Sequence, residues 1–381
     1  SKKLTLKQKL DFITEKLQDI KEQNLYRSLR HVKVNGPIIT IERKKLVNFC
    51  SNDYLGLSNP KPILGQLQSS SRLVSGNDVS FSKLEQKLAV HKSKESSLVF
   101  PTGYMANMGA IQALVDNDSV IFSDELNHAS IIEACKLTNA KVQIYKHNNI
   151  DDLRKKISKV KKRKFIVTEG VFSMDGDLAK LDEIASISDK TESVLIVDDA
   201  HGDFTLGKDG KGTPNIFGVE KQVDVYISSL SKGLGAFGGY VSSTKPVIDL
   251  CINKARSFIY TSALPSFLVE LALNKLKQDR VKSQKTLQQN VLLLISGLKQ
   301  IGFDITSNSH IIPIIVGNEK KTLEFSKFIY NNGVFAQPIR YPTVPKSKAR
   351  LRISVTAWLT KKHIEDALNV FEKAGKKFEL I

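Results

Sequence analysis

Residues 228–241 read SSLSKGLGAFGGYV. Gly233, Gly235 and Gly238 form the pattern G-x-G-x-x-G, which in a dinucleotide-binding fold lets the N-terminus of a helix approach a pyrophosphate. Lys232 stands directly before these glycines. The stretch therefore permits two interpretations. Either the glycines cradle a dinucleotide, or the lysine is the functional group and the glycines give it room.

The residues that follow argue against a dinucleotide site. Such a site needs a helix after the glycines and an acidic residue about 20 residues further on. Here GGYVSST (238–244) predicts a strand, and INKARSFI (252–259) contains no carboxylate. A phosphate-binding loop that ends in G-K-[ST] fails as well, because Lys232 precedes the glycines. A tight turn between two strands, with an incidental lysine, remains as the purely structural alternative.

The composition of the chain predicts a soluble protein with more than one domain. Its 381 residues exceed the size at which a single core stops growing. No apolar run approaches the ~20 residues of a membrane helix, and the N-terminal 20 residues are charged throughout, unlike a signal peptide. The three cysteines (Cys50, Cys135 and Cys251) form no C-x-x-C pair, which predicts reduced thiols. We therefore expect a cytoplasmic protein with no membrane partner.

The net charge of +18 raises the question of a polyanionic partner. The most basic run, RKKISKVKKRK (154–164), has Leu153, Ile157 and Val160 at helical spacing. This spacing favours the solvated face of an amphipathic helix over a nucleic-acid site, so we expect no nucleic-acid partner. An acidic small substrate remains compatible with the charge.

Strand-like runs alternate with amphipathic helical stretches, which predicts an α/β fold with a mainly parallel, doubly wound sheet. The runs are VIF (120–122), VQIY (142–145), FIVT (165–168), VLIV (194–197) and VDVYIS (223–228). After Pro265 we expect one long polar helix (268–302), a strand at 311–316 and a last helix that begins at Thr360. These features predict an N-terminal helical arm (1–45), a large domain (46–265) and a smaller α+β domain (266–381).

Ligands of open α/β sheets bind beyond the carboxyl ends of the strands, so the residues just after each run are the candidates for function. They include a lysine, an aspartate and two histidines: Lys232, Asp198, His128 and His201. The cluster DDAHGD (198–203) could hold a divalent metal, since carboxylates and imidazole suit manganese or iron. Pyridoxal phosphate instead requires a lysine for covalent attachment, an acid at the ring nitrogen and a donor to the ring oxygen. We expect pyridoxal phosphate and no metal, because only the former also uses the lysine.

Eight blocks resemble, in order, the α-oxoamine synthases, which are fold-type I pyridoxal-phosphate enzymes. The blocks are SNDYLGLSNP (51–60), SRLVSGN (71–77), DELNHASII (124–132), EGVFSMDGDLAKLDEI (169–184), VDDAHGDFTLG (197–207), SLSKGLGAFGGYV (229–241), FIYTSALP (258–265) and PTVPKSKARLRISVTA (342–357). The resemblance covers about Asn48 to Phe371 and implies a homodimer whose site lies at the subunit interface. It also implies an acyltransferase that joins an amino acid to an acyl-CoA or acyl-carrier protein with loss of carbon dioxide. NDYLGL, PTVP and RLRISVTA are most similar to members that condense L-alanine with a pimeloyl thioester in biotin biosynthesis; the alternative is a ligase that uses glycine and acetyl-CoA.

The resemblance implies roles around the cofactor ring. Lys232 is expected to hold the cofactor and to act as the base. Asp198 is expected to face the pyridinium nitrogen, and His128 to stack on the ring. His201 is expected to donate to the phenolic oxygen, with Ser173 nearby.

The cofactor phosphate has candidate ligands from both subunits. The resemblance implies that Gly103, Tyr104 and Ser229 bind it at the N-terminus of a helix. Thr261 and Ser262 match a block that reaches the phosphate of the neighbouring subunit.

Substrate carboxylates have candidate partners as well. Arg352, assisted by Asn52, is expected to bind the amino-acid carboxylate. Arg27, Arg30 and Thr343 are further substrate-binding candidates, the two arginines for a distal carboxylate on the acyl chain. Their alternative is an ordinary exposed position.

Three features depart from the family pattern. Asp78 and Phe81 stand where histidines are usual, the stretch before Ser71 is shorter, and Trp358 and Leu359 follow the TA block where a histidine is common.

Overall fold

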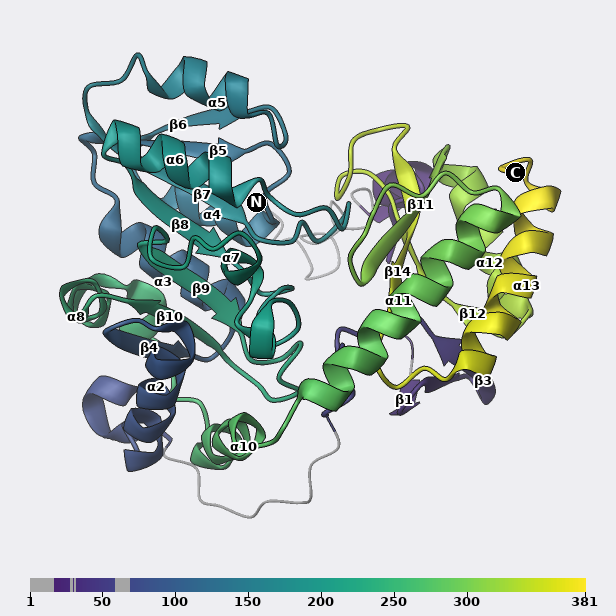
Figure 1. Cartoon of the computed structure of the whole chain (residues 1–381), viewed down its shortest axis with the longest axis horizontal. Coiled ribbons are helices and arrows are strands. Elements are labelled where there is room, and N and C mark those ends of the chain that lie inside the picture. The colour runs from purple at the N-terminus through teal and green to yellow at the C-terminus, as the bar shows by residue number, and fades with distance from the viewer. Residues whose placement is uncertain (1–16, 28–29, 31, 59–68) are drawn as a thin grey trace, which may run out of the picture.

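The computed structural model describes residues 17–27, 30, 32–58 and 69–381. They form two lobes, with helix α11 (Val281–Ile301) running from one toward the other (Figure 1). The first 16 residues of the predicted arm, His31 and most of the shortened stretch lie outside the described residues.

The larger lobe is built on a seven-stranded sheet with the order β4-β10-β9-β8-β7-β5-β6. Its strands are β4 (Ser96–Phe100), β5 (Ser119–Asp124), β6 (Lys141–Tyr145), β7 (Arg163–Glu169), β8 (Val194–Asp198), β9 (Val225–Ser229) and β10 (Gly239–Ser243). Strands β5 to β9 pair in parallel, and β10 runs antiparallel to both of its neighbours. The five predicted strand runs fall on β5 to β9, which confirms the predicted fold class.

Helices cover both faces of this sheet, which is why its strands read as continuous apolar runs. One face packs against α3 (Gly103–Leu114), α4 (Ala129–Leu137), α8 (Lys245–Lys254) and α9 (Arg256–Ile259). The other packs against α2 (Val79–Lys92), α5 (Ile150–Ile157), α6 (Leu181–Thr191) and α10 (Ser266–Leu276). The connections contain η1 (Arg72–Gly76), η2 (Lys208–Gly210) and α7 (Thr213–Ile216).

The smaller lobe contains a second core. Helices α11, α12 (Glu319–Asn331) and α13 (Lys361–Lys377) pack on an antiparallel sheet of β11 (Ile311–Gly317), β14 (Ala349–Ser354) and β13 (Gln337–Ile339). A four-stranded sheet of β1 (Val32–Asn35), β2 (Ile38–Ile41), β3 (Lys44–Asn48) and β12 (Val334–Phe335) adjoins it. Phe49 and Tyr54 also belong to this core, so the chain before the large sheet packs with the C-terminal elements.

Two local predictions differ from the structure. The predicted helix 268–302 is two helices, because the Asp279 carboxylate accepts a hydrogen bond from the Val281 amide and begins α11, while Arg280 donates to the last carbonyls of α10. The described part of the predicted helical arm is helical at 17–22 but also forms β1 and β2, which are joined by a turn at Gly36. The domain division at 265/266 itself stays a prediction; α10 packs with the larger lobe.

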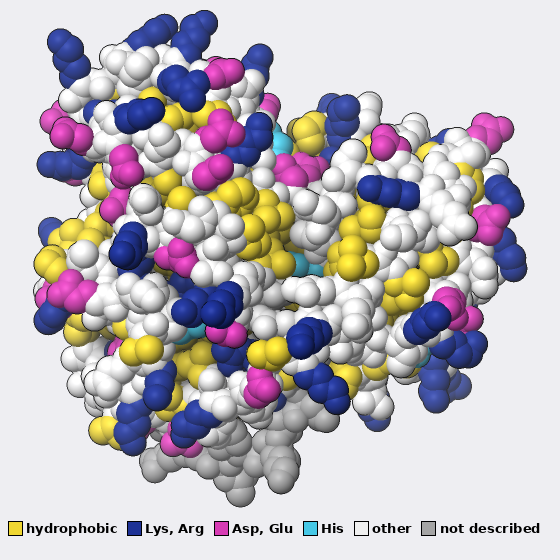
Figure 2. Space-filling model, viewed as in Figure 1, with side chains coloured by type: hydrophobic (Ala, Val, Ile, Leu, Met, Phe, Trp, Pro, Cys, Tyr) yellow, Lys and Arg dark blue, Asp and Glu magenta, His cyan; other side chains and the backbone are white. Residues whose placement is uncertain are grey.

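The basic residues of the run 154–164 are exposed or half-buried. In α5, Leu153 and Ile157 are buried whereas Arg154 and Lys155 are exposed, as the amphipathic interpretation predicts, but the helix ends at Ile157 and Arg163 already begins β7. On the face drawn in Figure 2, Lys and Arg side chains are spread over both lobes among Asp and Glu side chains. Within the described part of the chain, none of the helices has the length and apolar composition needed to cross a bilayer.

Candidate active site

Lys232 lies in the turn between β9 and β10, at the carboxyl end of the large sheet. Burial lowers the pKa of its amine. The Asp198 carboxylate opposes this shift, and the Arg352 guanidinium adds to it. The amine makes no hydrogen bond or ion pair with the residues that the structure describes. The glycines give this turn room: Gly235 has a φ of +70°, and a Cβ on Gly239 would lie 2.4 Å from the carbonyl of Thr102. A strand, not a helix, follows them, which excludes the dinucleotide interpretation.

Asp198 ends strand β8, and its side chain is held by two donors. Its Oδ2 accepts a hydrogen bond from Asn107 Nδ2 at 2.7 Å, and its Oδ1 accepts one from the Ala200 amide at 3.0 Å. The residue is 7% exposed. Two N–H donors stabilise the ionised form of a carboxyl group, so the local geometry suits a carboxylate that pairs with a cation.

His128 caps the N-terminus of α4. Its Nδ1 accepts hydrogen bonds from the Ser130 amide at 3.1 Å and the Ser130 hydroxyl at 2.7 Å, and that hydroxyl accepts from Asn107 Nδ2 at 2.9 Å. Burial lowers the pKa of His128, which Asp198 opposes. The ring is therefore neutral, with its proton on Nε2, and a continuous chain of hydrogen bonds fixes it relative to Asp198.

His201 is buried against Tyr54, a residue that the sequence did not single out. Its Nδ1 lies 2.6 Å from Tyr54 Oη, which also lies 3.1 Å from Asn52 Oδ1. Burial, Lys232 and Arg352 hold the pKa of His201 well below its usual range, and burial raises the pKa of Tyr54 to about 12. Tyr54 Oη is the donor to Asn52 Oδ1, and its contact with Nδ1 fixes the position of the buried His201 ring.

Arg352 comes from the smaller lobe, on β14. Its Nε donates to the carbonyl of Ser173 at 2.5 Å, and its Nη1 donates to Ser354 Oγ at 2.9 Å and to Asn52 Oδ1 at 3.4 Å. Arg352 thus reaches from the smaller lobe to the carbonyl of Ser173 in the larger lobe, so the two lobes meet at this point. The structure thus brings the predicted Asn52, Ser173 and Arg352 together.

The residues predicted to bind the cofactor phosphate lie at and beside the N-terminus of α3. A Cβ on Gly103 would lie 3.2 Å from Cβ of Ser229, so the helix N-terminus and the end of β9 are in close contact. Thr102 accepts a hydrogen bond from the Met105 amide, while no described residue accepts one from the amides of Gly103 and Tyr104. Free amides at a helix N-terminus suit an anion.

The remaining candidates lie elsewhere. Thr261 and Ser262 line a small cavity with Phe81 and Pro101, and none of the other cofactor candidates of this chain lines it. Arg27 Nη2 donates to Thr343 Oγ1 at 3.4 Å, and both residues line a separate cavity of about 200 Å³. Arg30 lies beside a larger groove, over the ring of Tyr330.

Two departures from the family pattern have structural roles. Trp358 Nε1 donates to Asp53 Oδ2 at 2.6 Å, and its ring lies 3.1 Å from where a Cβ of Gly56 would stand. Trp358 therefore holds the turn that carries Asn52 and Tyr54. Asp78 caps α2 by accepting from the Ser80 amide.

The donor set fits pyridoxal phosphate. A lysine amine with a lowered pKa, a carboxylate held by two donors and a helix N-terminus with free amides are the three groups that this cofactor requires. The amide oxygen of Asn107, beside Asp198, is also buried and has no hydrogen-bond partner among the residues that the structure describes. Such an orphaned polar atom is expected where a bound group is absent.

This arrangement is that of a fold-type I pyridoxal-phosphate enzyme, as the sequence predicts. The chain belongs to the aminotransferase class I and II family, whose model matches residues 44–371. It is 42% identical to 8-amino-7-oxononanoate synthase from Thermoanaerobacter pseudethanolicus over 390 residues, with 98% of each chain covered. The resemblance to the α-oxoamine synthases is thereby confirmed.

Solved structures agree with this assignment. A serine palmitoyltransferase from S. paucimobilis, which contains bound pyridoxal phosphate, superposes with a TM-score of 0.90 at 26% identity, over 99% of this chain and 100% of the other. The 8-amino-7-oxononanoate synthase from Francisella tularensis gives a TM-score of 0.77 at 29% identity, over 88% of this chain and 99% of the other.

Proposed function

We propose that the chain is a pyridoxal-phosphate-dependent acyltransferase that condenses L-alanine with a pimeloyl thioester in biotin biosynthesis. The products are 8-amino-7-oxononanoate, carbon dioxide and CoA or a free carrier protein. The observation that carries this proposal is that Arg352, from the smaller lobe, donates to Ser173 after β7, next to the strand ends that carry Asp198 and Lys232. The name of the relative that is 42% identical over nearly the full length supports the choice of reaction.

Pyridoxal phosphate, when bound, supplies an electron sink for the substrate Cα. In this chain Lys232 is the covalent anchor, and Asp198 keeps a proton on the ring nitrogen. His128 would contact the cofactor ring, and His201 would interact with the ring oxygen, with Ser173 nearby. The free amides of α3 and the Ser229 hydroxyl hold the phosphate.

Two residues act on the amino acid. The Arg352 guanidinium binds the substrate carboxylate, and the hydrogen bonds to Ser173 and Asn52 fix its orientation. Lys232 Nζ removes the proton from Cα; its lowered pKa leaves a larger share of the amine unprotonated at neutral pH. In the overall reaction Cα would take the acyl group, the thiol of CoA or of the carrier protein would leave, and the amino-acid carboxyl group would be lost as carbon dioxide.

The proposal includes a homodimer. The resemblance assigns Thr261 and Ser262 to the phosphate of the neighbouring subunit, and the cavity that they line contains none of the other phosphate candidates of their own chain. Arg27 and Thr343, which line the smaller cavity together with Arg340, are proposed to recognise the distal carboxylate of the pimeloyl chain.

The substrate pair tests this proposal. We expect L-alanine with pimeloyl-CoA to be the preferred pair, and glycine with acetyl-CoA to react poorly. Discrimination against glycine is expected to be modest, because one methyl group in a pocket contributes about 1–3 kcal/mol. Acyl selectivity is expected to be larger, because acetyl would leave the partner of the distal carboxylate unpaired. Measuring kcat/KM for each combination, with carbon dioxide release, decides between the two reactions. A preference for glycine with acetyl-CoA would assign the chain to the ligase alternative.

The Arg352→Lys substitution tests amino-acid binding. Lysine keeps the charge but loses the planar fork and the bond to the Ser173 carbonyl. We expect KM for L-alanine to rise by about tenfold to a hundredfold, on the scale of hydrogen bonds to charged groups, with a smaller change in kcat. The matched control is Arg163→Lys, because Arg163 forms an exposed ion pair with Asp116. An unchanged KM in Arg352→Lys would show that another group binds the carboxylate.

A further inference from the structure

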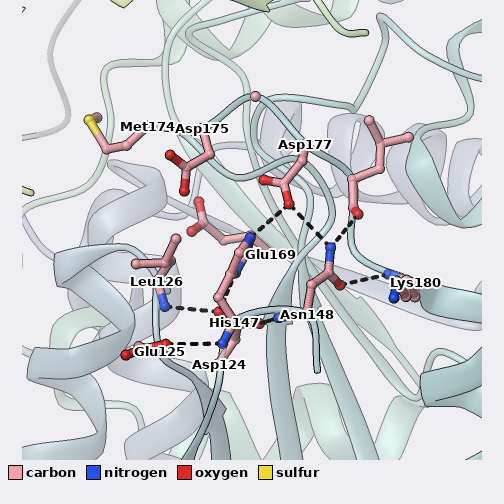
Figure 3. A network of polar contacts seen from close by, with 12 residues as sticks. Asp124, Glu125, Leu126, His147, Asn148, Glu169, Met174, Asp175, Asp177 and Lys180 are labelled. Carbon is pink, nitrogen blue, oxygen red and sulfur yellow. Dashed lines mark hydrogen bonds and ion pairs between the residues drawn. The ribbon is translucent and has the colours of Figure 1, made fainter. Parts of the chain in front are cut away.

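A second polar network lies beside the site and takes no part in the chemistry described above (Figure 3). At its centre, His147 Nδ1 lies 2.8 Å from Asp124 Oδ1, and Nε2 lies 2.7 Å from Asp177 Oδ2. Asp124 ends strand β5 and is buried, whereas Asp177 follows β7 in the connection to α6. One imidazole therefore joins two carboxylates that lie on separate connections of the large lobe.

A metal ion is a poor occupant of this cluster. Ligand atoms of His147, Asp175 and Asp177 lie within 4.8 Å of one another. However, each ring nitrogen of His147 already faces a carboxylate at hydrogen-bonding distance. Burial lowers the pKa of His147, but the hydrogen bonds to Asp124 and Asp177 outweigh burial and raise this pKa to about 10. A doubly protonated imidazole has no lone pair for a metal, so the cluster is a hydrogen-bonded link.

His147 and its neighbour hold the connection that follows β7. Asn148 Nδ2 donates to the carbonyl of Leu178 at 2.8 Å and to Asp177 Oδ2 at 3.2 Å. The Phe172 ring packs edge-on against the His147 ring, with centroids 4.4 Å apart. Asp124 also accepts from the Asn148 amide at 2.9 Å. The segment 173–177 is thus fixed to the large lobe at its C-terminal end.

Residues of the smaller lobe also form hydrogen bonds with segment 173–177. Arg352 donates to the Ser173 carbonyl, Arg350 donates to the Met174 carbonyl and pairs with Asp175, and Ser309 Oγ donates to the Gly176 carbonyl at 2.5 Å. These contacts come from β14 and from the residues just before β11. The segment 173–177 is therefore the point at which the large lobe fixes the orientation of the smaller-lobe arginines.

We propose that His147 is a positioning residue that anchors segment 173–177, so that the Ser173 carbonyl holds Arg352 in the orientation that binds the amino-acid carboxylate. This inference rests on the role of Arg352 in the proposed function. It assigns His147 no contact with substrate or cofactor. Its effect on the reaction passes through the hydrogen bond from Arg352 Nε to Ser173.

Two variants test the anchor in the holoenzyme. His147→Asn removes one of the two links, and Asp177→Leu removes the acceptor at a position where the carboxylate side chain is 37% exposed. In both, we expect faster amide hydrogen exchange in 173–177 and a KM for L-alanine raised by about tenfold to a hundredfold, as for a misplaced binding group. The kcat value and the absorbance spectrum of the bound cofactor should change much less. Asp177→Asn keeps an acceptor oxygen and is expected to restore alanine affinity to within about threefold.

The matched control is His363→Asn, because His363 caps α13 far from this network in the sequence and is expected to change none of these quantities. Unchanged exchange in 173–177, or faster exchange with an unchanged KM, would overturn the inference. A lower thermal midpoint alone, with normal alanine affinity, would overturn it as well. If the wild-type protein releases no carbon dioxide from L-alanine and pimeloyl-CoA, the proposed function fails. Amide exchange and spectral titration with alanine then still decide the role of His147.

Discussion

Lys232→Ala is expected to lower kcat by at least about 10⁴-fold, the upper range of a lost general base, because the same amine also anchors the cofactor. The variant should still bind pyridoxal phosphate, but without a covalent bond. Since the described residues include no hydrogen-bond partner of Lys232, its removal should leave the thermal midpoint nearly unchanged. The measurements are kcat, the absorbance spectrum of the bound cofactor, and peptide mass after borohydride reduction, which should label Lys232 in the wild type only.

The matched control for this prediction is Lys254→Ala, because Lys254 is exposed at the end of α8. It should retain normal turnover and the borohydride label. Near-normal activity in Lys232→Ala would refute both roles of the lysine. A borohydride label on a different lysine would refute the anchor alone.

The large sheet could be predicted because each of its strands carries its own local signal. Runs such as VLIV and FIVT are apolar on both faces, and the intervening helices show helical spacing. The break between α10 and α11 was missed, although the four polar residues 277–280 separate Leu276 from Val281 and interrupt the helical spacing. At the break the Asp279 carboxylate accepts from the Val281 amide, and Arg280 donates to the carbonyls of the last turn of α10.

The packing of the N-terminal strands could not be read from the sequence. β3 pairs in parallel with β12, whose residues follow almost 300 positions later, and Trp358 reaches back to Asp53. Local periodicity carries no information about such pairings. The turn at Gly36 that joins β1 and β2 was missed, because this stretch was assigned to the helical arm.

The candidate site also contains some residues that could be predicted from the sequence and others that could not. Lys232, Asp198 and His128 could be predicted because parallel strands deliver their carboxyl ends to one edge. The residues that orient them were missed: Asn107 lies 91 positions from Asp198, and Tyr54 lies 147 positions from His201. An asparagine one turn into α3 looks like an ordinary polar residue until the helix is packed on the sheet.

The two adjacent aspartates at the end of β8 face different surroundings. Successive side chains of a strand point to opposite sides, and Asp198 meets Asn107 whereas Asp199 meets Thr213 and Tyr226. Asp199 is fully buried and accepts hydrogen bonds from Thr213 Oγ1 at 2.6 Å, the Thr213 amide at 2.8 Å and Tyr226 Oη at 2.6 Å. Its contacts are structural, although it stands one position from the proposed catalytic acid.

Asp198→Asn is therefore expected to lower kcat by about 10²- to 10³-fold, the scale of a lost electrostatic contact in a catalytic site, because an amide cannot stabilise a protonated ring nitrogen. The amide nitrogen of the asparagine would meet one of the two donors, Asn107 Nδ2 or the Ala200 amide, so a stability loss of roughly 1–3 kcal/mol is expected as well. Asp199→Asn makes the matched comparison. It should lose a similar amount of stability, because an amide nitrogen would meet one of the donors that Asp199 now accepts from, but it should keep most of kcat. Measuring kcat for both variants, with the free energy of unfolding as the control for folding, separates the two roles. If kcat is more sensitive at Asp199, the side chain that faces the ring is the neighbouring one, and the assignment of Asp198 is wrong.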